Sequence, residues 1–83
     1  MSNLSCCPNA EWLPELDLPQ AAGFDFLLGK CARCGTHWMN VFCIPTSITG
    51  YERVSPQDVA AIRAMQNTQE LKRFLRQWSD TNL

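Results

Sequence analysis

Five cysteines occur in this chain of 83 residues, and this number restricts the folds open to it more than any other feature. A chain of this size buries only a modest core, so small domains often add disulfides or a metal ion. A secreted disulfide framework would normally use an even number of cysteines. Met1–Asn9 has no basic region followed by an apolar run, so we expect no signal peptide and a cytoplasmic location. In a reducing cytosol, clustered cysteines bind metal or carry out redox chemistry more often than they form disulfides.

Two of the cysteines belong to the motif Cys31-x-x-Cys34-Gly35, which lies between two predicted strands. The two-residue spacing lets both thiolates reach one ion at about 2.3 Å. The residue after the second cysteine often needs a positive φ, which glycine allows. The motif resembles the zinc knuckle of rubredoxin-like and zinc-ribbon proteins, and the resemblance covers roughly Phe24–Ile44. It implies that zinc is the cofactor.

Spacing alone leaves the fourth ligand open, because no second Cys-x-x-Cys knuckle occurs upstream. The upstream cysteines are adjacent, and 23 residues separate Cys7 from Cys31. We predict Cys7, Cys31 and Cys34 as the first three ligands. Cys6 and His37 are close alternatives for the fourth: vicinal cysteines can share a metal at a cost in geometry, and His37 follows Cys34 by three residues.

Cys43 ranks third as the fourth ligand. Nine residues of straight strand would place it about 30 Å from Cys34, and a free cysteine is often a small core residue. A redox pair at Cys31 and Cys34 is the alternative to a metal site. Such pairs normally open a helix, whose N-terminus lowers the pKa of the first thiol. The residues after Gly35 favour a strand instead.

Proline recurs every five or six positions in residues 1–23, which prevents a long helix, so we expect an extended arm there. Residues 24–54 are expected to form a small antiparallel zinc-ribbon-like sheet that carries the knuckle. Its predicted strands are Phe24–Leu28, Thr36–Ile44 and Tyr51–Val54.

Residues 55–79 carry the signals of two helices. Ser55 is a predicted N-cap followed by Pro56 at the first helical position, and Thr68 is the predicted cap of a second helix after a stop at Asn67. Apolar residues recur at helical spacing in both segments. The sequence therefore predicts one α+β domain over residues 1–83, with a C-terminal αα-hairpin packed on one face of the sheet.

The predicted site does not favour catalysis. A catalytic zinc keeps an open position and needs a general base nearby, and three thiolates make the ion a poor Lewis acid. No His-Glu-x-x-His motif occurs. We therefore expect that the chain is not an enzyme.

Seven basic residues stand against eight acidic ones, and this balance disfavours a dedicated nucleic-acid binder. The apolar stretches are too short to cross a bilayer, so no membrane partner is expected. We predict a protein-interaction module, with Trp12, Trp38 and Trp78 as candidate partner contacts. Its size, acidity and Cys-x-x-Cys-Gly-x-x-Trp core are similar in style to small bacterial immunity or antitoxin-type proteins, which implies an inhibitor that binds a toxin.

The alternative function is a nucleic-acid-binding zinc ribbon. Lys30, Arg33, His37 and Trp38 surround the knuckle, and such basic and aromatic groups can pair and stack with bases.

Overall fold

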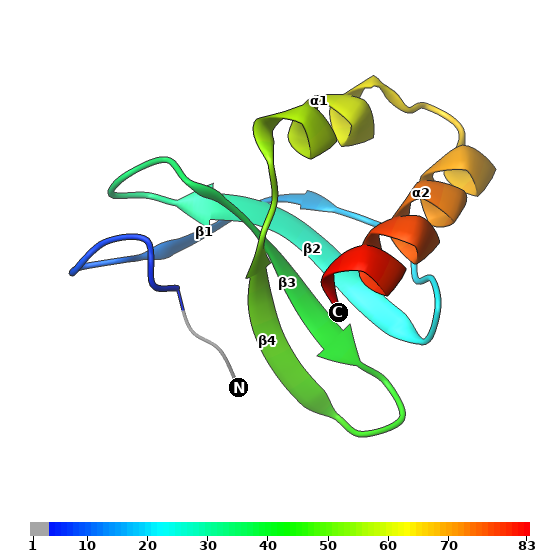
Figure 1. Ribbon diagram of the computed structural model, residues 1–83, viewed down its shortest axis with the longest axis horizontal. Coiled ribbons are helices and arrows are strands. Elements are labelled where there is room, and N and C mark those ends of the chain that lie inside the picture. The colour runs from blue at the N-terminus through cyan, green and yellow to red at the C-terminus, as the bar shows by residue number, and fades with distance from the viewer. Residues whose placement is uncertain (1–3) are drawn as a thin grey trace.

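The computed structural model describes residues 4–83, which form a four-stranded antiparallel sheet with two helices over one face (Figure 1). The strands are neighbours in chain order, β1-β2-β3-β4. The architecture is α+β, as predicted. The elements are β1 (Trp12–Asp17), β2 (Phe24–Cys31), β3 (His37–Cys43), β4 (Ile48–Arg53), α1 (Pro56–Ala64) and α2 (Thr68–Asn82).

The pairing of β2 with β3 forms the centre of the sheet and of the core. Phe26 lies opposite Val41, and Leu28 lies opposite Met39. Because side chains alternate between the two faces of a strand, these four residues share one face. All four are buried, and that face carries the helices. The core cluster consists of Ala21, Phe26, Leu28, Met39, Val41, Val54, Val59, Ile62, Leu75 and Trp78.

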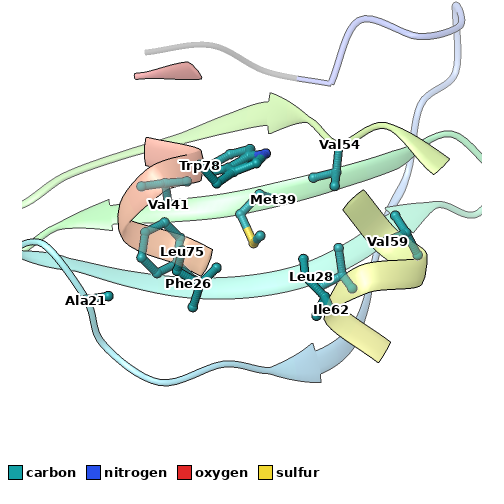
Figure 2. Packing of buried hydrophobic residues seen from close by; sticks show 10 residues of the cluster. All are labelled: Ala21, Phe26, Leu28, Met39, Val41, Val54, Val59, Ile62, Leu75 and Trp78. Atoms are coloured by element: carbon teal, nitrogen blue, oxygen red, sulfur yellow. The ribbon is translucent and has the colours of Figure 1, made fainter. Parts of the chain in front are cut away.

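The two helices cover different ends of this face (Figure 2). Ile62 of α1 lies near Leu28, whereas Trp78 of α2 packs edge-on against Phe26 with ring centroids 6.2 Å apart. The structure confirms two C-terminal helices on one face of the sheet, but they follow one another along the sheet and do not pack against each other as the expected αα-hairpin. Each helix is held mainly by its own apolar stripe on the strands.

Side-chain caps fix the starts of both helices. Ser55 Oγ accepts the Asp58 N–H at 3.1 Å and caps α1, as predicted. Asn67 caps α2, and its Oδ1 accepts the N–H groups two and three residues ahead at 2.8 and 3.3 Å. The prediction of Thr68 as this cap is wrong by one residue. The cap position needs an extended backbone and a short side-chain acceptor, and Asn67 supplies both.

The structure differs from the expected irregular arm at β1, which pairs with β2 along Trp12–Asp17. Pro14 is compatible with this strand because β1 is an edge strand, where a missing N–H need not break a ladder. The register shifts between Pro14 and Leu16, which marks a bulge. Residues 1–3 of the expected arm lie outside the described residues.

Trp12 begins β1 and lies on the sheet face opposite the helices. Its ring lies over Gly29 of β2, where an added Cβ would come within 2.5 Å of both the Trp12 ring and the Leu13 carbonyl oxygen. Glycine at position 29 therefore allows this close approach. The Trp12 ring also meets Tyr51 of β4 edge-on, with ring centroids 5.1 Å apart.

The burial of α2 gives a test of this packing. Leu75 is fully buried, so Leu75→Ala should lower the free energy of unfolding by about 2–5 kcal/mol. Leu83→Ala makes the same change at a side chain that is 51% exposed and should cost less than about 0.5 kcal/mol. Urea denaturation followed by circular dichroism measures both. Equal costs would show that α2 does not pack on the sheet as described.

Candidate metal centre

The predicted knuckle forms the turn between β2 and β3. Cys31 ends β2, and its backbone N–H donates to the Thr36 carbonyl at 2.9 Å. Gly35 has φ +79°, a left-handed conformation that favours glycine, and its N–H donates to the Cys31 carbonyl at 2.8 Å. These bonds close the turn and place the side chains of Cys31 and Cys34 on one side. The motif lies in a β-turn and does not open a helix.

The chain before β1 brings two further cysteines to this turn. Cys6 and Cys7 lie in a bend that leads into a turn at residues 8–9. Glu11 then anchors the segment, because its carbonyl accepts the Ala32 N–H at 2.8 Å and its carboxylate lies 3.6 Å from Arg33 Nε. The ion pair is exposed and contributes little. The backbone bond continues the β1–β2 pairing and sets the position of the arm.

Four sulfur atoms meet as a result. The Sγ atoms of Cys6, Cys7, Cys31 and Cys34 all lie within 4.8 Å of one another. The Cys7 and Cys31 sulfurs are 3.6 Å apart, well beyond the length of a disulfide bond, about 2.05 Å. Sulfur atoms around a tetrahedral zinc at about 2.3 Å are separated by about 3.8 Å. The group therefore has the size of a four-sulfur metal site and is close enough to bind a metal ion.

The turn favours the thiolate form of its two cysteines. Burial raises the pKa of Cys31, but backbone N–H groups of Glu11, Cys34 and Arg33 outweigh it and lower that pKa to about 6. The pKa of Cys34 is lowered chiefly by the side chain and backbone of Thr36, whose hydroxyl lies 3.2 Å from the Cys34 sulfur. Sequence reasoning did not identify Thr36. A hydroxyl residue two positions after the second cysteine is the signal that would have found it.

The pKa values of Cys6 and Cys7, in the segment before β1, shift in the opposite direction. Burial, together with the hydrogen bonds that the Cys7 thiol donates to Cys31 and Cys34, raises the pKa of Cys7 to about 12. Burial also raises the pKa of Cys6, whereas the Trp38 side chain acts in the other direction. The thiols of Cys6 and Cys7 therefore face a turn that favours the thiolate form of its own cysteines. Metal binding needs all four thiolates and would release the protons of the arm.

An unpartnered buried donor beside the site fits a metal-bound thiolate. Trp38 is only 4% exposed, and its Nε1 has no hydrogen-bond partner among residues 4–83. Buried N–H groups are rarely left without an acceptor. A metal-bound sulfur carries negative charge and accepts such a donor well. The donor set, its size and this N–H are therefore all compatible with a bound metal.

The structure places the other candidate ligands elsewhere. His37 lies on the face of β3 that carries the helices, and its Nε2 is 3.3 Å from Glu15 Oε1, although it makes no well-formed hydrogen bond. Glu15 also pairs with Arg63 of α1 at 3.1 Å. Cys43 lies at the far end of β3, half-buried and opposite Phe24 and Ile48. Neither His37 nor Cys43 joins the sulfur group.

Of the predicted partner contacts, Trp38 and Trp78 are each 4% exposed, and Trp78 belongs to the core (Figure 2). Their burial leaves little ring surface for a partner. Trp12 is half-buried against Gly29 and Tyr51. The larger exposed apolar side chains among residues 4–83 are Leu13, Leu16, Ile44, Ile48 and Leu83.

Comparison with known protein families, with curated proteins and with solved structures gives no match for this chain. Neither helix in residues 4–83 has the length and apolar composition needed to cross a membrane.

The ligand set can be tested by single substitutions. Cys6→Ser should abolish tight binding of one Co²⁺ ion per chain, because it removes a sulfur from the group. His37→Ala and the matched control Cys43→Ser should retain it, because their side chains lie outside the group. The intensity of the cobalt absorption bands at saturation measures this. Loss of cobalt from His37→Ala with retention in Cys6→Ser would place the histidine in the site.

Proposed function

We propose that this chain is a small zinc-binding protein that acts by binding another protein and that uses the ion to hold its binding-competent fold. The observation that carries the proposal is the meeting of four cysteine sulfurs from two chain segments within 4.8 Å. Zinc is the ion of choice because four-thiolate tetrahedral sites are typical of structural zinc.

A structural role agrees with the composition of the group. Four protein sulfurs fill a tetrahedral coordination sphere and leave no position for a reacting water. Among residues 4–83, the group contains only cysteines. It includes no histidine or carboxylate that could act as a general base. The ion would supply a crosslink between the arm and the β2–β3 turn, and we assign it no catalytic step.

The protein-binding part of the proposal is supported by charge and by exposed apolar groups. A formal net charge of −1 offers little attraction to phosphates. Ile48 of β4 is 59% exposed and Ile44, in the preceding turn, is 41% exposed. A partner that covers such side chains gains from their burial. An inhibitor of the immunity type is the specific form of this proposal, by analogy of size and acidity alone.

Purified protein should carry one zinc ion per chain, and removing the ion should unfold the domain or much of it. Structural zinc contributes about 10 kcal/mol or more in small domains, which is comparable to the whole stability of about 5–15 kcal/mol of ordinary proteins. Native mass spectrometry measures the zinc content. Circular dichroism and tryptophan fluorescence then follow a melt before and after a strong chelator under reducing conditions.

Two results would contradict this prediction. Protein from zinc-replete cells that contains no zinc would remove the metal site. A melting curve unchanged after proven loss of zinc would show that the core of β2, β3 and the helices stands alone. A redox pair at Cys31 and Cys34 would then become the preferred interpretation of these cysteines.

Nucleic acid should bind weakly or not at all. The holoprotein should pass through heparin and DNA columns at low salt, because few cations are free to displace phosphate counterions. Arg63 and Lys30 already face Glu15, at 3.1 and 3.7 Å. Retention that falls steeply as salt rises would support the nucleic-acid-binding alternative.

A further inference from the structure

Trp38 and Trp78 form an informative pair. Both side chains are 4% exposed, and neither indole N–H has a hydrogen-bond partner among residues 4–83. A buried donor without an acceptor is costly, so each one needs an explanation. The two residues differ in what surrounds them.

Trp38 shares a face of the sheet with the cysteine site. It lies opposite Gly29 in the β2–β3 register, and Cys31 follows Gly29 by two residues on the same strand. Residues two apart on a strand point to the same face, so the side chains of Trp38 and Cys31 lie on the side away from the helices. Trp78 lies among the core residues on the helix side (Figure 2).

Two further contacts involve Trp38. Burial raises the pKa of the Cys6 thiol, and the Trp38 side chain opposes this rise, as a donor near the sulfur does. The guanidinium carbon of Arg53 lies over the Trp38 ring, 5.3 Å from its centroid. A cation over the indole draws electron density from the ring and makes its N–H a better donor.

We propose that Trp38 is a positioning residue of the metal centre, whose indole N–H donates to the sulfur of Cys6 when that sulfur is a metal-bound thiolate. The inference rests on the proposed zinc site. A four-thiolate zinc site carries a net charge of −2, and N–H donors around it stabilise that charge and orient the ligands. Backbone N–H groups act on Cys31, and Thr36 acts on Cys34. Trp38 does the same for Cys6, which belongs to the arm.

The test compares Trp38→Phe with Trp78→Phe. Both changes replace an equally buried indole by a benzene ring and remove an unpartnered N–H, but only Trp38 shares the sheet face of the cysteine group. Zinc affinity is measured by competition with a chromophoric chelator. We expect Trp38→Phe to weaken zinc binding about 10-fold, at the lower end of the effect of losing such a supporting partner. Trp78→Phe should leave zinc affinity within about twofold of the original chain, because it keeps every group at the site.

A second readout separates positioning from simple loss of stability. In the Co²⁺-loaded protein, the sulfur-to-metal charge-transfer band should move to longer wavelength in Trp38→Phe, because the Cys6 thiolate loses a donor. A destabilised fold alone would not move this band. An unchanged band and affinity in Trp38→Phe, or the same losses in Trp78→Phe, would overturn the inference. Failure of the original chain to bind zinc would instead overturn the proposed function, and this inference with it.

Discussion

The antiparallel register of β2 and β3 is the constraint on which the rest of the molecule depends. It places Phe26 and Leu28 on the face that the helices cover, and Gly29 and Cys31 on the other face. A slip of one residue would exchange these two sets, exposing the core and turning Cys31 inward. One set of backbone bonds therefore fixes both the hydrophobic core and the cysteine group. The core and the candidate metal centre lie on opposite faces of the same pair of strands, β2 and β3.

The electrostatics of the cysteine group follow from the strands as well. Cys31 ends β2 at a turn. Backbone N–H groups of that turn, together with the N–H of Glu11 just before β1, favour the Cys31 thiolate. Glu11 is in place because β1 pairs with β2 and Trp12 lies opposite Cys31. An edge strand that adds little to the core thus contributes to the chemistry of the site. The ring of Trp12 reinforces this pairing by covering Gly29.

Local patterns were sufficient to predict β2, β3 and both helices, because their apolar spacing and the cap at Ser55 are contained in short windows of sequence. β1 was missed because prolines argue against regular structure, and an edge position is a property of the whole sheet. The choice between Cys6 and His37 also could not be made from distance along the chain. It depends on which face of the sheet each side chain lies on. The structure places His37 beside Glu15 on the helix face, away from the cysteine group.

The two halves of the cysteine group are prepared to different degrees. Cys31 and Cys34 belong to a turn that hydrogen bonds already close, including the 2.8 Å bond from Gly35 to Cys31. Cys6 and Cys7 belong to a short irregular segment, and adjacent residues in an extended chain would point in opposite directions. The bend at these residues allows both sulfurs to face the turn. Ordering that segment costs conformational entropy, and this cost is subtracted from the free energy of metal binding. The affinity of the group for a metal ion would therefore be set less by the preformed turn at Cys31 and Cys34 than by the contacts that hold the Cys6–Cys7 segment against that turn.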